Sequence, residues 1–388
     1  MDTRQEPQSM SEATNDSSVV FEERSTAKGY CVAFAQLNAP RALNSLSRTM
    51  IDRLQAQLDA WAERDDIVCV VLYGAGERAF CAGGDVIGLY KAMTATADAP
   101  SADAEAFFAR EYRLDHRIHR YPKPVLCWAT GTVMGGGLGV MAGASHRVVT
   151  ECSRIAMPEV TIGLFPDVGA SWFLGRMPQR IGLFLGLTTT PMQPGDALWL
   201  GLGDYRIDSG QREAVFAALT QLDWQGERAA DDAVLARGLH EFEDVAESDN
   251  ARRESMLFAN QQTIARLTDT PSVAAFTQRL AEQAEADDWF AHGAKAIAGA
   301  SPLSLTVVHR QLARDPKLSI EQVFQRELAM AIACTRRPDF AEGIRALLVD
   351  KDKNPQWTPT TLDAVTSEQI AAHFTLPDDY AQHPLADL

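Results

Sequence analysis

The chain has 388 residues, 46% of them hydrophobic and 23% charged, which is typical of a globular protein with one large domain or two. Its 36 basic and 52 acidic residues give a net charge of −16, which argues against general binding to nucleic acid or to anionic membranes. No run of apolar residues approaches membrane-spanning length, and no membrane association is expected.

The N-terminal segment, residues 1–17, is polar and acidic. It has no apolar core like that of a signal peptide and is too acidic for a mitochondrial presequence, so we expect a disordered tail and a cytoplasmic location. The six cysteines are scattered and form no C-x-x-C pair. Reduced thiols in a cytoplasmic protein explain them, and no metal site is expected.

The first regular elements are expected to be two paired strands, at about 19–22 and 30–37. A helix follows, with Ser45 or Ser47 as its N-cap. Apolar residues recur in it at three- and four-residue steps from 46 to 61, which predicts one buried face.

Continuous apolar runs come next along the chain. IVCVVLY (67–73) fits a strand buried on both faces, and PVLCW (124–128) and the segment 148–150 have the same character. Helices are expected between these strands, at about 104–120 and 136–143. Strands that alternate with helices predict an α/β domain.

After about residue 175 the sequence indicates mainly helices. Residues 224–300 are rich in Glu, Asp and Ala, and further helix starts are indicated at Ser301–Pro302 and at Ser319, where Gln322 completes a capping box. We therefore expect three parts: a tail at 1–17, an α/β core with the functional site at 18–224, and a C-terminal helical region at 225–388.

A first glycine-rich turn, AFCAGGD (79–85), follows the buried strand at 67–73 and leads towards a helix, with Asp85 near the helix start. Two adjacent glycines let the backbone approach a ligand closely, with N–H groups pointing outwards. A tight strand-to-helix turn without any ligand explains the pair equally well.

A second glycine-rich turn, TVMGGGLG (132–139), opens the helix expected after PVLCW. Three glycines at a helix start cost conformational entropy, so a reason for them is expected. An N–H at the positive end of the helix, aimed at an oxygen that gains negative charge, is one reason, and close packing of the helix on the sheet is another. The two are compatible. The G-x-G-x-x-G spacing of dinucleotide sites is absent.

Two carboxylates lie in the apolar segment IAMPEVTIGLFPDVGASWFLGRM (155–177). Glu159 and Asp167 would be desolvated there unless they line a pocket, and desolvation raises a carboxyl pKa to where it suits acid–base or nucleophilic work. The simpler alternative is a solvent-facing Glu159 and an Asp167 that caps a helix beginning near Gly169.

These motifs occur in an order that resembles the crotonase (enoyl-CoA hydratase/isomerase) superfamily: LNAPRALNSL (37–46), AFCAGGD, TVMGGGLG and AMPEVTIGLFPDVG. FFAREY (107–112) and the C-terminal DFAEGIRALLVDKDKNPQW resemble its branch of 3-hydroxyisobutyryl-CoA hydrolases. The resemblance covers about residues 18–375. It implies an α/β fold, a crotonase-like spiral of ββα units with an appended C-terminal α-helical region.

The resemblance also implies catalytic positions. The backbone N–H groups of Gly84 and Gly136 would form the oxyanion hole for the thioester carbonyl. Glu159 occupies the position of the catalytic carboxylate. Asp167 occupies a second acidic position, which in the hydrolases helps to place the substrate hydroxyl and assists catalysis.

Further positions are implied for substrate binding. Glu111 matches a substrate-site carboxylate, and Asp85 is placed with it among the substrate-binding residues. Arg41, Ala42 and Leu43 lie where the family holds the adenosine part of coenzyme A. No cofactor is expected, because coenzyme A is part of the substrate.

One departure from the hydratase pattern bears on the reaction. Hydratases use two glutamates, one of them shortly after the triple glycine, and here that place is Gly139. This favours hydrolysis of a short 3-hydroxyacyl-CoA, most simply 3-hydroxyisobutyryl-CoA in valine catabolism, with Glu159 as base or nucleophile. An enoyl-CoA hydratase or isomerase and a non-catalytic binding or structural protein are the alternatives. Whether the protein is a homo-oligomer stays open.

Overall fold

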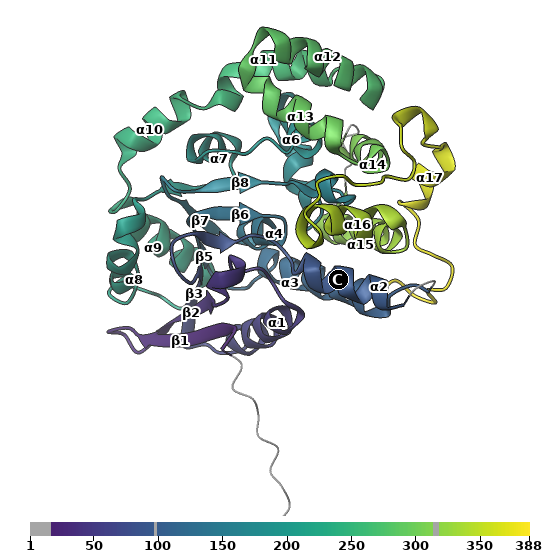
Figure 1. Ribbon diagram of the computed structural model, residues 1–388. Helices are drawn as coiled ribbons and strands as arrows, with labels where there is room; N and C mark the ends of the chain where they lie inside the picture. Colours follow the sequence, from purple (N-terminus) through teal and green to yellow (C-terminus); the bar gives the residue numbers. More distant parts are fainter. Residues whose placement is uncertain (1–16, 97–98, 313–317) are drawn as a thin grey trace, which may run out of the picture.

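The strands form two sheets in the computed structural model, which describes residues 17–96, 99–312 and 318–388 (Figure 1). The larger sheet has the order β1 (Val19–Ser25), β2 (Cys31–Leu37), β3 (Ile67–Gly74), β5 (Val125–Ala129), β7 (His146–Val149) and β9 (Tyr205–Arg206). Its first pair is antiparallel and the other pairs are parallel. The smaller, parallel sheet consists of β4 (Ala79–Cys81), β6 (Thr132–Met134) and β8 (Arg154–Ala156).

Successive segments of the chain add one strand to each sheet and then a helix or helical turn. β3 and β4 precede α2 (Val86–Ala95) and α3 (Ala102–His119), and β5 and β6 precede α4 (Gly136–Gly143). β7 and β8 are followed by the 3-10 helix η2 (Glu159–Ile162). This repeated order confirms the expected α/β spiral of ββα units.

The expected strands and helices of the N-terminal half are present within a few residues of the predicted bounds. Between β2 and β3, η1 (Pro40–Ala42) precedes α1 (Arg48–Ala62), for which Ser47 rather than Ser45 is the N-cap. The short strands of the smaller sheet were not predicted as strands. The expected tail at 1–17 lies outside the described residues except for Ser17.

The rest of the described chain is mainly helical, and beyond Trp224 the described residues contain no strand. The short elements before that point are α5 (Ala170–Phe173), η3 (Leu174–Arg176), η4 (Pro178–Arg180), α6 (Ile181–Thr188), α7 (Pro194–Leu200), η5 (Ser209–Gln211) and α8 (Arg212–Leu219). Those after it are α9 (Arg228–His240), α10 (Val245–Arg253), α11 (Met256–Thr268), α12 (Val273–Ala286), η6 (Asp288–Phe290), α13 (Ala291–Gly299), α14 (Pro302–Leu312), α15 (Ile320–Thr335), α16 (Pro338–Ile344), η7 (Arg345–Val349), η8 (Leu362–Ala364) and α17 (Ser367–Ala372).

The C-terminal helices pack against helices of the first half that carry or follow the motifs described above. α15 contacts α3, α16 contacts both α2 and η2, and η7 contacts α2 (Figure 1). The chain then returns to α3, where Asp387 forms an ion pair with Arg113 at 2.7 Å. The division into a core and a C-terminal region at residue 224 stays a prediction, since the two share contacts throughout. None of the described helices is long and apolar enough to cross a membrane.

Candidate active site

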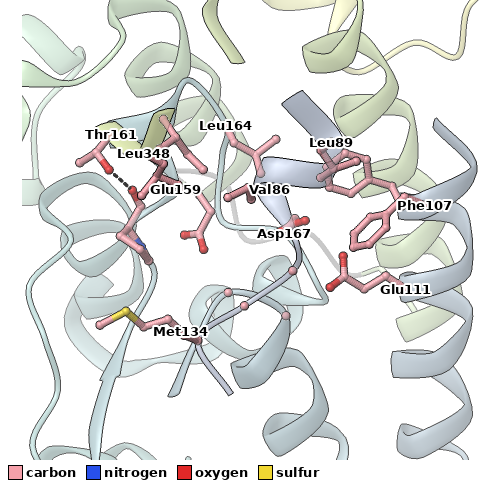
Figure 2. Close-up of a pocket in the computed structure, with 18 of the residues that line it drawn as sticks. Val86, Leu89, Phe107, Glu111, Met134, Glu159, Thr161, Leu164, Asp167 and Leu348 are labelled. Atoms are coloured by element: carbon pink, nitrogen blue, oxygen red, sulfur yellow. Dashed lines mark hydrogen bonds between the residues drawn. The ribbon is translucent and has the colours of Figure 1, made fainter. Parts of the chain in front are cut away.

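A cavity of about 230 Å³ lies where the motif segments meet (Figure 2). Both glycine-rich turns, the N-terminal parts of α2 and α3, and the segment 158–167 contribute to its wall. The π-helical turn η7 adds Leu347 and Leu348, which also reach the surface. Its lining residues are Ala82, Gly83, Gly84, Val86, Leu89, Phe107, Phe108, Glu111, Met134, Gly135, Gly136, Pro158, Glu159, Thr161, Ile162, Leu164, Asp167, Leu347 and Leu348.

The two glycine-rich turns face each other at this cavity. Gly83 has φ +109° and Gly135 has φ +48°, backbone conformations that favour glycine and that set the direction of the following N–H groups. A Cβ added to Gly136 would lie 3.4 Å from the nitrogen of Gly84, so the two following residues are close neighbours. Within the described residues neither the Gly84 nor the Gly136 N–H donates to a protein acceptor.

Backbone hydrogen bonds from the segment around residue 43 hold the turn at Gly84 in place. Ala82 N–H donates to the carbonyl of Leu43 at 3.0 Å, and the N–H of Leu46 donates to the Gly83 carbonyl at 2.8 Å. Arg41 and Ala42 are exposed in η1, and neither they nor Leu43 line the cavity. Their role in binding the adenosine part of coenzyme A stays a prediction.

Glu159 begins η2 and is only 5% exposed, so the solvent-facing alternative is wrong. Its Oε1 lies 3.2 Å from where a Cβ of Gly135 would be, and its Oε2 has no hydrogen-bond partner in the described part of the chain. Burial, and then the charge of Asp167, raise the pKa of the Glu159 carboxyl well above its ordinary value. The Glu159 carboxyl that lines the cavity therefore has one oxygen, Oε1, beside the second glycine turn and another, Oε2, without a partner among the described residues.

Asp167 is also buried, and its side chain does not cap the helix that follows. The Tyr112 hydroxyl donates to Asp167 Oδ2 at 2.7 Å. Burial raises the pKa of Asp167 to about 7, and the hydrogen bond from Tyr112 opposes this rise because it favours the charged form. The capping alternative is therefore wrong, and Asp167 is instead oriented from α3.

Two residues of the C-terminal helices hold the loop that carries Asp167 in place. Glu327 on α15 accepts hydrogen bonds from the N–H groups of Gly169 and Ser171, each at 2.7 Å. The Gln311 amide on α14 donates to the Pro166 carbonyl at 2.7 Å. Sequence reasoning missed both residues, although the position of Glu327 directly before the apolar run LAMAIA (328–333) was a signal for a buried polar contact.

Glu111 lies on α3 opposite Glu159, with its carboxylate directed into the cavity (Figure 2). Its Oε1 occupies the position next to both turns: a Cβ on Gly84 would lie 3.4 Å from it, and a Cβ on Gly136 would collide with it. This oxygen has no hydrogen-bond partner among the described residues. Burial, followed by the charge of Asp167, raises the pKa of Glu111 well above its ordinary value.

Asp85 lies outside this group. Its side chain accepts a hydrogen bond from the Gly88 N–H at 2.9 Å and so caps α2. It lines a neighbouring cavity together with Arg48 rather than the one described above, and its expected contact with the substrate stays a prediction. In the described ranges, no group of three or more His, Cys, Asp or Glu side chains is arranged to hold a metal ion.

Comparison with known proteins gives a consistent set of relatives. The family model for enoyl-CoA hydratase/isomerase matches residues 32–374. Proteins named "3-hydroxyisobutyryl-CoA hydrolase, mitochondrial" are 34% identical in Danio rerio, over 88% of this chain and 87% of the relative, and 32% identical in Homo sapiens, over 91% and 88%.

Similar solved structures bear other names. An enoyl-CoA hydratase from Rhodobacter sphaeroides 2.4.1 is 32% identical with a TM-score of 0.79, over 92% of this chain and 97% of that one. A carnitinyl-CoA dehydratase from Mycobacterium thermoresistibile is 32% identical with a TM-score of 0.81, over 95% and 99%.

Proposed function

Because the chain belongs to the enoyl-CoA hydratase/isomerase family, we propose that it hydrolyses the thioester of 3-hydroxyisobutyryl-CoA, or of a closely similar short 3-hydroxyacyl-CoA, to the 3-hydroxy acid and free coenzyme A. One observation carries the proposal. The N–H groups of Gly84 and Gly136, which have no acceptor among the described residues, lie side by side in a cavity, next to the buried carboxyl of Glu159.

The N–H pair supports catalysis at a carbonyl group. When water or a carboxylate attacks the thioester carbon, the carbonyl oxygen gains negative charge, and preorganised donors stabilise that charge more than they stabilise the substrate. We place this oxygen between Gly84 and Gly136. Their N–H groups cost no reorganisation at the moment of reaction, because the positive φ values of Gly83 and Gly135 already fix the two turns.

Glu159 is the group we place at the reacting carbon. Its ionised form either takes a proton from the attacking water or attacks the carbon itself. Both routes fit a carboxyl that has Oε1 beside Gly135 and an Oε2 with no hydrogen-bond partner among the described residues. The leaving thiolate takes up a proton and departs as free coenzyme A. Asp167, oriented by Tyr112, is placed to bind the 3-hydroxyl group of the acyl chain.

The surroundings of Gly139 support hydrolysis over hydration. A Cβ at this position would lie 2.6 Å from Cβ of Val168 and 3.0 Å from Oδ2 of Asp115. A glutamate side chain therefore has no room to extend from residue 139. The second glutamate that the addition of water to a double bond uses in hydratases is missing, and its space is filled.

The names of the similar solved structures make hydration or dehydration the competing reaction. A panel of acyl-CoA thioesters separates the two. We expect the protein to release thiol from 3-hydroxyisobutyryl-CoA and to leave the absorbance of crotonyl-CoA unchanged. Loss of crotonyl-CoA absorbance without thiol release would favour a hydratase, and failure to bind coenzyme A in a titration would favour a non-catalytic protein.

Cellular location and assembly are separate predictions. The relatives from Danio rerio and Homo sapiens are named as mitochondrial proteins, so these names do not support the cytoplasmic location expected from the sequence. Cell fractionation tests it. Sedimentation of the purified protein tests whether it forms a homo-oligomer.

A further inference from the structure

Three titratable side chains lie one turn apart on the same face of α3. The first of them lines the cavity, and none has a role in the proposed reaction so far. They are Glu111, Asp115 and His119, which we call the α3 ridge. Each has a buried polar atom with no hydrogen-bond partner among the described residues: Oε1 of Glu111, both carboxyl oxygens of Asp115, and Nε2 of His119. Asp115 is completely buried, whereas His119 is partly exposed.

The neighbouring helix α4 faces this ridge with glycines. A Cβ at Gly136 would collide with the carboxyl group of the first ridge residue. A Cβ at Gly139 would lie 3.0 Å from Oδ2 of Asp115. A Cβ at Gly143 would lie 3.1 Å from Cδ2 of His119. The glycine stripe therefore lets α4 approach α3 closely enough to bury the whole ridge.

A buried aspartate without partners is costly, so its presence calls for a reason. Burial raises the pKa of Asp115 well above its ordinary value, and the charges of Glu111, Asp167 and Glu327 raise it further. These three described neighbours are all acidic, and they favour its neutral form. A neutral carboxylic acid can accept a proton on one oxygen and release the proton from the other.

The surroundings of His119 also favour a neutral side chain, in this case the uncharged imidazole. Burial, together with the charges of Arg147 and Arg120, lowers the pKa of His119 to about 4. Its ring is therefore neutral at physiological pH and has one N–H donor and one free acceptor nitrogen. The residue is partly exposed, and Nε2 is buried whereas Nδ1 is not among the buried atoms without a partner, so we place Nδ1 towards solvent.

We propose that the α3 ridge carries protons from the cavity to solvent during turnover. This proposal rests on the proposed hydrolysis, in which thioester and water give a carboxylic acid and a thiol. The acid product ionises, so one proton per turnover has to leave a buried site. Glu111 takes this proton from the product, Asp115 accepts it on one oxygen while releasing its own from the other, and His119 passes one on to solvent in the same way.

The geometry of an α-helix supports this order. Side chains four residues apart lie about 5–6 Å apart at Cβ, which is within reach of a direct hydrogen bond or of one bridging water molecule. The ridge starts at the N–H pair of Gly84 and Gly136, where we place the product, and ends at a partly exposed residue, His119. No metal ion or other cofactor is needed for the transfer.

The test compares two time courses in single turnover, in weakly buffered solution. Loss of the thioester absorbance reports cleavage, and a pH-indicator dye reports release of the proton. In the wild type we expect the two to coincide. In Asp115→Asn, cleavage should proceed while proton release lags by about 100-fold or more, the lower end of what a positioned proton-transfer group contributes.

A second variant covers the case that Asp115→Asn does not fold. In His119→Ala the same lag is expected, and imidazole added to the solution should shorten it, which a purely structural role would not produce. His116→Gln is the matched control on the same helix. Its ring pairs with Glu321 at 3.3 Å and lies off the ridge, so no lag is expected.

The outcomes separate the two proposals. Coincident cleavage and proton release in both Asp115→Asn and His119→Ala would overturn the relay and leave the hydrolase intact. Absence of thioester cleavage by the wild type would overturn the proposed function and the relay with it.

Discussion

Alanine at position 136 is the sharpest test of where the thioester oxygen binds. The added methyl group would lie 3.4 Å from the Gly84 nitrogen, in the space that we assign to the oxygen, and would also displace the Glu111 carboxylate. Loss of one oxyanion donor costs about 2.7–4 kcal/mol, a factor of about 10²–10³ in kcat. Since the methyl group keeps the oxygen from both donors, we expect Gly136→Ala to lower kcat/KM by about 10³ or more.

The fold should tolerate this change. Alanine is favoured over glycine within a helix by roughly 0.5–1 kcal/mol, and the displaced atom is the end of a flexible side chain. We expect the midpoint of urea unfolding to change little. Gly299→Ala is the matched control, because it also adds a methyl group to a helical glycine but meets no atom within 4 Å.

A double-mutant cycle with Glu111→Ala separates the two effects of the methyl group. If the oxygen binds between the two N–H groups, Gly136→Ala should remain strongly inactivating when the Glu111 carboxylate is absent. Activity within tenfold of the Glu111→Ala parent would refute the assignment, because the methyl group would then act only by displacing Glu111.

Other side chains of the site give further predictions. Tyr112→Phe removes the 2.7 Å hydrogen bond to Asp167, so the Asp167 pKa should rise and the acid limb of the kcat/KM profile should shift upwards by about 1–2 pH units, as expected for a hydrogen bond to a charged group. Glu327→Gln leaves one of two buried N–H groups without its acceptor, so the free energy of unfolding in urea should fall by about 1–3 kcal/mol. For Asp115 the folded pKa is raised, so the folded chain holds its proton more tightly than the unfolded chain, and stability falls as the pH rises above the ordinary carboxyl value. Asp115→Asn should therefore show a smaller loss of melting temperature between acidic and neutral pH than the wild type.

Much of the fold followed from local patterns in the sequence. IVCVVLY and PVLCW are long enough and apolar enough to indicate buried strands, and Ser47 and Ser319 are N-caps as expected. The smaller sheet was missed because its strands have only three residues each, too few for any periodicity. Two of those strands, β4 and β6, lead directly into the glycine turns. The sequence therefore indicated the two motifs but not the direction of their N–H groups.

The site was predictable where its residues lie within motifs and unpredictable where they meet across the chain. Glu159, Asp167, Glu111 and both glycine turns were assigned from the sequence, and all of them line one cavity. The support for Asp167 was not foreseen, because Tyr112 lies 55 residues away and Glu327 is separated from Gly169 by 158. Such pairings depend on how helices pack, which no local pattern encodes.

The central claim is that Glu159 acts on a thioester held by the two N–H groups. The most direct measurement is the rate of thiol release from (S)-3-hydroxyisobutyryl-CoA by the wild type and by Glu159→Gln, a neutral side chain of the same shape that can neither take a proton from water nor attack the carbon. We predict rapid release by the wild type and a rate lower by roughly 10²–10⁴ in the variant, with coenzyme A still bound. Equal rates for the two proteins would contradict the account.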